Sequence, residues 1–246
     1  MTYGLATFQP LLEQLCQDFR VVTWDPRGTG RSDPLPGPYY ITDYVEDLRA
    51  VVEAIGNGPV IVVGNSRGAT VGAHFAAKYP HLVERLVLAG LNIAGGWGRP
   101  DAPHADRADM EFLRRLRGAM EEEDWSTVVS LFIPQVAAGE LGVQKLIEGG
   151  IRHWSQIPQD SLRNFFKLDD PGRDVRPLLP ALRVPTLVLH GGHDRINPVE
   201  AARWAAEQIP GAQFHALEGR SHMMVATAPA EFAQAVRQFI RTGRPT

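Results

Sequence analysis

The sequence contains very little cysteine and has no long apolar run. Cys16 is the only cysteine in 246 residues, which excludes an intrachain disulfide and favours a reducing compartment. No stretch is long enough to span a membrane as a helix, and the first residues lack the charged-then-apolar pattern of a signal peptide. A soluble cytoplasmic protein is therefore expected. Cys16 lies in an apolar pattern and is expected to be a core thiol.

Neither sign of charge is in large excess. The formal net charge is −3 and no basic run is present, so neither nucleic acid nor a membrane surface is an expected partner. The eight histidines show no clear metal-ligand spacing, and no metal is expected. These absences leave a small molecule as the expected partner.

Short apolar runs alternate with helix-like segments along most of the chain. The runs are rich in β-branched residues, as buried parallel strands are, and lie at 19–25, 60–65, 85–90, 185–191 and, nearer the sheet edge, 213–219. The amphipathic segments predict helices at 8–18, 42–55, 67–79, 198–209 and 229–241. This alternation predicts the α/β class with a doubly wound, mostly parallel sheet.

The alternation stops in the middle of the chain. Residues 92–173 hold no convincing strand, but they do hold helical patterns interrupted by glycine and proline. We therefore expect a core formed by 1–91 and 174–246, with 92–173 inserted as a helical cap over one end of the sheet.

The run at 60–65 ends in GNSRG at 64–68, a match to G-x-S-x-G. The match follows a predicted strand and opens a predicted helix, as in a nucleophile elbow, although it is also compatible with a plain strand-to-helix loop. In an elbow, Ser66 has a strained backbone and both glycines are needed because neighbouring chain leaves no room for side chains. The Arg67 backbone N–H would face the oxyanion.

A nucleophilic serine needs a base, and the base needs a group that orients it. Asp194 follows the run at 185–191, and His222 follows the run at 213–219. In a parallel sheet these loops lie at the same edge. Ser66, Asp194 and His222 are therefore the predicted catalytic residues, in the chain order of the α/β-hydrolase triad.

With these residues in place, nearly the whole chain resembles the α/β-hydrolase family. The segment WDPRGTGRSD at 24–33 is similar to the family's D-x-R-G-x-G-x-S turn, and the segments around Asp194 and His222 are similar to its C-terminal part. From the residues alone, we expect the 24–33 turn to have a structural role rather than a catalytic one. The resemblance implies a serine hydrolase that needs no cofactor and carries a cap.

One family feature is missing. Family members have a strand ending in His-Gly ahead of the first helix, and the residue after it supplies the second oxyanion donor. By this resemblance, Tyr3 stands at the donor position, but no apolar strand precedes it. The absent strand belongs between 21–25 and 60–65. We expect a shortened version of a longer protein; the alternative is a sheet that has re-paired and lost the oxyanion hole. A strand edge left unpaired would favour a homo-oligomer.

The leading functional prediction is a carboxylesterase-like enzyme for small to medium, largely uncharged ester or acyl substrates. A carbon–carbon bond hydrolase of aromatic ring-cleavage products is an alternative, because those enzymes also tend to have Asn before the nucleophile, as Asn65 is here. Arg67 and Met223 differ from the residues common at these positions in those enzymes. A cofactor-free perhydrolase uses the same triad. The absent strand supports another class, a ligand-binding homologue with impaired catalysis.

Other candidate residues have structural interpretations. His190 and His193, near the proposed acid, are expected to support it or to be exposed. The cap aromatics fit either an apolar substrate pocket or packing between cap helices, and these are Trp97, Trp125, Trp154, Phe165 and Phe166.

Overall fold

A computed structural model of the chain describes residues 4–33, 37–56, 58–93, 101, 103–104, 109–140, 142–167 and 169–242. Its centre is a parallel sheet with the strand order β1-β2-β3-β4. The strands are β1 (Val60–Asn65), β2 (Val83–Ala89), β3 (Thr186–Gly191) and β4 (Gln213–Leu217). Four of the predicted strands are thus confirmed, and β4 lies at an edge as expected.

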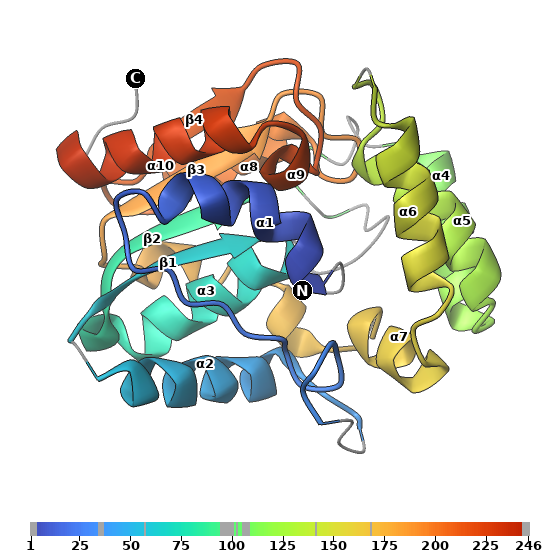
Figure 1. Cartoon of the computed structure of the whole chain (residues 1–246), viewed down its shortest axis with the longest axis horizontal. Helices are drawn as coiled ribbons and strands as arrows, with labels where there is room; N and C mark the ends of the chain where they lie inside the picture. The colour runs from blue at the N-terminus through green and yellow to red at the C-terminus, as the bar shows by residue number, and fades with distance from the viewer. Residues whose placement is uncertain are drawn as a thin grey trace.

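Helices cover both faces of this sheet (Figure 1). One face carries α1 (Gly4–Leu15), the short α9 (Met224–Thr227) and α10 (Pro229–Thr242), and the other carries α2 (Ile41–Ile55), α3 (Arg67–Lys78) and α8 (Val199–Gln208). Short 3-10 turns occur at Pro80–Leu82, Pro171–Arg173 and Leu179–Ala181. The predicted doubly wound α/β fold is therefore confirmed. No helix in the described part is long and apolar enough to cross a membrane.

The apolar runs are continuous because both faces of the sheet are buried. In β2, Leu86 and Leu88 pack into the core beneath α2, α3 and α8, whereas Val87 and Ala89 pack into the core beneath α1 and α10. All four side chains are fully buried. Successive side chains of a strand point to opposite faces, so a strand between two helix layers needs apolar residues at every position.

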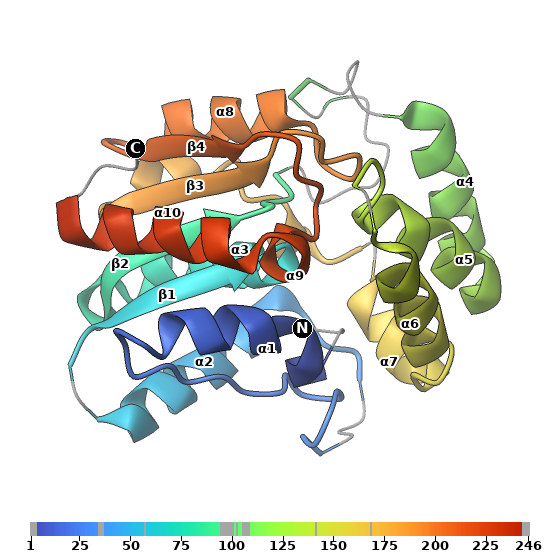
Figure 2. The same cartoon turned by 45° about the horizontal axis from the view of Figure 1, so that its top comes forward.

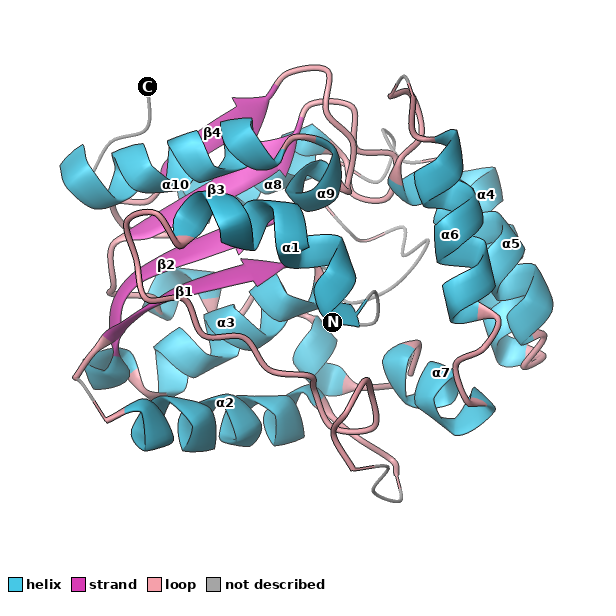
Figure 3. Cartoon of the chain, in the orientation of Figure 1, coloured by secondary structure: helices cyan, strands magenta, loops and turns pink. Residues whose placement is uncertain are grey.

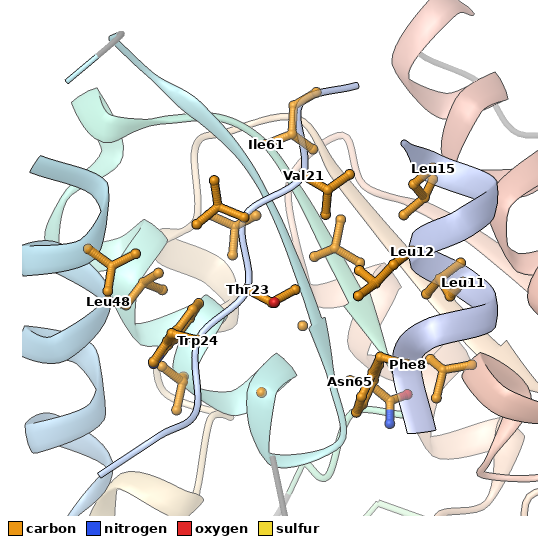
Figure 4. Close-up of a pocket in the computed structure, with 18 of the residues that line it drawn as sticks. Phe8, Leu11, Leu12, Leu15, Val21, Thr23, Trp24, Leu48, Ile61 and Asn65 are labelled. Carbon is orange, nitrogen blue, oxygen red and sulfur yellow. The ribbon is translucent and has the colours of Figure 1, made fainter. Parts of the chain in front are cut away.

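The segment 19–25, predicted as a strand, is not a strand. It passes alongside β1 as a loop (Figure 4), and no backbone hydrogen bond joins the two within the described residues. A cavity of about 500 Å³ is lined by both segments. Strand pairing needs a neighbour about 4.8 Å away, and none of the ladders among the described residues includes the loop. Within the described residues, β1 therefore lies at one edge of the sheet, at the place where the family resemblance puts a further strand.

The first helix also differs from its prediction. It ends at Leu15 rather than near residue 18, and Leu15 is the side chain that packs in the core. Cys16 begins the turn that follows and is exposed. The prediction of a core thiol was wrong, because the helical period that placed Cys16 inside stops one residue before it.

The middle of the chain is helical where it is described. It forms α4 (Met110–Glu121), α5 (Trp125–Val136), α6 (Gln144–Trp154) and α7 (Gln159–Phe165). The Asp109 and Asp124 carboxylates accept backbone N–H bonds that cap α4 and α5. Figures 2 and 3 show these four helices grouped beyond the C-terminal ends of the strands.

Candidate active site

Ser66 lies in a strained turn between β1 and α3. Its backbone has φ 55° and ψ −120°, a left-handed φ that is costly for a residue with a side chain. The Ser66 N–H donates to the carbonyl of Ala89 at 2.8 Å, which holds the turn against the end of β2. The strand–turn–helix setting predicted for Ser66 is present.

The two glycines of the motif are not equivalent. A Cβ built on Gly64 would lie 2.2 Å from the Gly68 carbonyl oxygen, whereas a Cβ on Gly68 would meet nothing within 4 Å. The prediction that both positions lack room was correct for Gly64 and wrong for Gly68. Gly64 is required because α3 crosses directly over β1, while Gly68 lies on an open side of the helix.

Asp194 and His222 form a buried hydrogen-bonded pair. His222 Nδ1 lies 2.7 Å from Asp194 Oδ2, and both side chains are nearly inaccessible to solvent. The other carboxylate oxygen, Oδ1, accepts backbone N–H bonds from Ile196 and Asn197. Burial alone would raise the pKa of Asp194, but its histidine partners outweigh burial and hold the pKa well below its usual range. Asp194 is therefore an anion that can orient an imidazole.

His190 shares the same carboxylate. Its Nε2 lies 3.2 Å from Asp194 Oδ2 and 2.9 Å from the Asn197 carbonyl oxygen. Burial alone would lower the pKa of His190, but the Asp194 carboxylate raises it above the ordinary histidine value. His190 thus supports the acid at the same oxygen that contacts His222, which is one of the two roles expected from sequence. His193 is exposed.

A glutamate from the helical segment holds the histidine loop. Glu140 Oε1 accepts hydrogen bonds from the Ser221 N–H at 2.7 Å and from the Thr227 hydroxyl at 2.9 Å. The Met223 N–H donates to the carbonyl of Val136 at the end of α5. Sequence reasoning missed Glu140, and no local pattern marks it, because its partners lie more than 80 residues away in the chain.

Ser66 and His222 line one cavity, whose volume is about 500 Å³. Within the described residues no hydrogen bond joins the two side chains. Figure 4 shows the cavity between α1, the loop at Val21–Trp24 and β1. Its walls are mostly apolar, so it can hold an acyl group beside the serine.

Arg67 also lines this cavity. Its backbone N–H, in the first turn of α3, has no acceptor within the helix, as an oxyanion donor requires. The predicted second donor, Tyr3, lies outside the described residues. The described residues contain no group of three or more His, Cys, Asp or Glu side chains placed to hold a metal ion.

The aromatic residues of the helical segment divide between packing and lining. Trp154 and Phe166 are buried with ring centroids 5.5 Å apart, and Trp125 stacks on Phe166 at 6.2 Å. Phe165 lines the cavity. Packing therefore describes Trp125, Trp154 and Phe166, and cavity lining describes Phe165. Trp97 lies outside the described residues.

The turn at 24–33 is structural in the described geometry. The Arg27 guanidinium makes two hydrogen bonds of 2.6 and 2.7 Å to the Asp47 carboxylate on α2. A Cβ on Gly30 would lie 2.4 Å from Asp25 Cγ. These contacts fix the shape of the turn, whose residues Trp24, Asp25, Pro26 and Thr29 also line the cavity, and they agree with the assignment of this turn to structure.

Comparisons with known proteins agree on one family. The sequence profile described as "Alpha/beta hydrolase family" matches residues 2–235. A protein of Caulobacter sp. strain K31 named as a carbamate hydrolase, RutD, is 28% identical over 242 residues, which are 96% of this chain and 87% of that protein.

Solved structures give the same result. A thermophilic esterase from Thermogutta terrifontis, with malate bound, is 28% identical with a TM-score of 0.78, covering 96% of this chain and 85% of that one. A hydrolase from Pseudomonas aeruginosa PA01 is 26% identical with a TM-score of 0.79, covering 97% and 86%.

Proposed function

The chain belongs to the alpha/beta hydrolase family, and we propose that it is a serine hydrolase cleaving carboxylic esters or related acyl compounds through an acyl-enzyme. One observation carries the proposal: His222, paired with Asp194 at 2.7 Å, lines the same cavity as Ser66 at its strained turn. A base, its orienting acid and a serine on a turn are the parts that acyl transfer needs.

In the proposed mechanism, Ser66 Oγ attacks the substrate carbonyl while His222 Nε2 takes its proton. His222 then donates that proton to the leaving alcohol, which departs from the tetrahedral intermediate. In the second half, His222 takes a proton from water, and the hydroxide attacks the acyl-enzyme. His222 then gives this proton to Ser66 Oγ as the bond to the acyl carbon breaks, which releases the acid and regenerates Ser66. Asp194 stays ionised, keeps the useful tautomer of His222 and stabilises its cation.

The Arg67 N–H is the proposed first oxyanion donor. Tyr3 remains the proposed second donor. A missing donor typically lowers turnover by about 10²–10³, so slow turnover by this chain would be consistent with an incomplete oxyanion hole.

We also propose that residues 92–173 act as a cap over the cavity. Phe132 on α5 and Phe165 on α7 both line the cavity that contains Ser66, so the helical segment contributes to the wall that selects the substrate. Apolar walls favour an acyl group of small to medium size.

The test is hydrolysis of p-nitrophenyl acetate and butyrate by the unmodified chain and by Ser66→Ala. We expect the unmodified chain to hydrolyse both esters, and we expect kcat/KM of Ser66→Ala to be lower by about 10³-fold or more. A fluorophosphonate probe should label the unmodified chain and not Ser66→Ala. If the two proteins release p-nitrophenol equally slowly and neither is labelled, the chain is a ligand-binding homologue instead.

Carbamate cleavage is a second candidate. It is supported by the name of the 28% identical Caulobacter protein, whose match spans 96% of this chain. Carbamates and esters both present a carbonyl to the nucleophile, so the same triad serves both. Ammonia release from a carbamate, measured beside ester hydrolysis and compared with Ser66→Ala, separates the two substrates.

A further inference from the structure

A cation lies in the cavity wall beside the proposed nucleophile. The Arg67 guanidinium carbon is 4.0 Å from the ring centroid of Tyr44 on α2 and 5.1 Å from that of Phe165 on α7. All three residues line the cavity that holds Ser66 and His222. None of the ion pairs within the described residues includes Arg67. Arg67 is thus held by aromatic faces and not neutralised by a direct salt bridge.

A second guanidinium stands near the first. Burial, together with repulsion from Arg67, lowers the pKa of Arg173 to about 10, so Arg173 is still charged at neutral pH. One of its nitrogens donates to the carbonyl of Phe165, but its Nε is buried without a hydrogen-bond partner. Two cations therefore share a partly dehydrated region, and one has an unused donor.

One carboxylate attracts both of these cations. Asp170 attracts both Arg67 and Arg173, but its oxygens already accept backbone N–H bonds from Ile41 at 2.7 Å and Gly172 at 2.9 Å. His74 lies against the Gly172 carbonyl, and burial lowers its pKa, so it is neutral at pH 7. Asp169 also attracts Arg173, but it is paired with Lys167 at 2.8 Å. The three positive groups (Arg67, Arg173 and Lys167) therefore exceed the two carboxylates (Asp169 and Asp170) by one positive charge.

We propose that Arg67, supported by Arg173, binds a carboxylate on the substrate, so that the preferred substrates are esters with a free carboxylate near the scissile carbonyl. This inference rests on the proposed function. A guanidinium pairs with a carboxylate through two parallel hydrogen bonds, and the pair is strong where water is scarce. The sequence analysis predicted a largely uncharged substrate, which would give the Arg67 side chain no role in binding.

A structural role is the competing explanation. The Arg67 guanidinium touches α2 and α7 at once, and it could serve only as a latch between the core and the helical segment. A latch predicts that Arg67 variants lose stability and bind charged and neutral ligands equally badly. A carboxylate site predicts a loss confined to the charged ligand.

The test compares two matched ligands on the Ser66→Ala variant, in which the ester stays intact. Mono-p-nitrophenyl glutarate carries a free carboxylate, and its methyl ester is the neutral counterpart. We expect calorimetry to show about tenfold or more tighter binding of the charged ligand. Adding Arg67→Gln should abolish this preference, and adding Arg173→Gln should reduce it severalfold.

Arg152→Gln, an exposed site on α6, is the matched control and should leave the preference unchanged. Circular dichroism and thermal melting of each variant check the fold. The inference is overturned if the two ligands bind equally to the Ser66→Ala variant. It is also overturned if the preference survives both arginine substitutions, or if Arg67→Gln weakens both ligands alike.

Turnover of the same two esters by the unmodified chain separates this inference from the proposed function. Ser66-dependent hydrolysis without charge preference would leave the function standing and reject the carboxylate site. Tighter, Arg67-dependent binding of the charged ester without Ser66-dependent hydrolysis would keep the site and reject the serine hydrolase.

Discussion

Glu140 Oε1 accepts a 2.7 Å hydrogen bond from the backbone N–H of Ser221, the residue that precedes His222. The Glu140 side chain is only 4% exposed, so this contact is shielded from water. It ties the helical segment to the loop that carries the proposed base. The position of His222 therefore depends on a residue outside the core sheet.

Glu140→Ala should lower kcat by about tenfold to a hundredfold with little change in KM, because the loop carrying His222 loses its main side-chain acceptor. The orphaned, shielded Ser221 N–H should also cost about 1–3 kcal/mol of stability. Steady-state kinetics and urea unfolding measure the two effects. Glu140→Gln keeps an oxygen acceptor and should restore most of kcat, and Glu148→Ala, an exposed position on α6, should change neither. Equal kcat for all three variants would contradict the positioning role.

His190 should make stability depend on pH. Its pKa is raised in the folded state, so its stabilisation is complete below the unfolded value of about 6.5 and is lost as pH rises through the folded pKa. In His190→Gln, the free energy of unfolding should fall less between pH 6 and pH 9 than in the unmodified chain. Denaturant unfolding at several pH values is the measurement, with exposed His193→Gln as the control. Parallel pH profiles for His190→Gln and the unmodified chain would show that His190 does not gain a proton on folding.

The strain at Ser66 predicts a difference between two inactive variants. Both Ser66→Gly and Ser66→Ala remove the proposed nucleophile, but only glycine adopts φ 55° without a side-chain penalty. We expect Ser66→Gly to be more stable than Ser66→Ala by about 1–2 kcal/mol, as measured by urea unfolding. An alanine variant as stable as the glycine variant would mean that the turn is not strained.

The two motif glycines should respond differently to alanine. Gly64→Ala forces a Cβ to 2.2 Å from a backbone carbonyl, so α3 must move, and soluble folded protein should be lost or Tm should drop sharply. Gly68→Ala has room and replaces glycine within a helix, which should leave the fold intact and add up to about 1 kcal/mol of stability. Thermal melting of the two variants side by side tests this. A fold that tolerates both equally would contradict the close crossing of β1 and α3.

The turn at Ser66 and the positions of Asp194 and His222 after their strands were predictable because each depends on short local patterns. An apolar run that ends in GNSRG specifies a strand, a tight turn and a helix within a dozen residues. Asp194 and His222 could be placed because the carboxyl ends of parallel strands meet at one edge. Local patterning also predicted helices α4 and α5.

Two predictions failed because they depend on tertiary contacts, which the local sequence pattern does not specify. Residues 19–25 have the composition of a strand, but a strand also needs a pairing partner, and the space beside β1 holds a cavity instead. Cys16 has an apolar neighbourhood in sequence, yet the helix ends at Leu15 and turns it outward.

The sequence by itself therefore determined the α/β alternation, the serine turn and the acid and histidine that lie near it, since these follow from periodicity and from the order of strand ends. Only the tertiary structure decided that Glu140 holds the histidine loop, that His190 shares the carboxylate of Asp194, and that Arg173 lies near Arg67 in a partly dehydrated region. Each of these contacts either joins residues distant in sequence or depends on burial. Long-range contacts and burial arise only when the chain has packed.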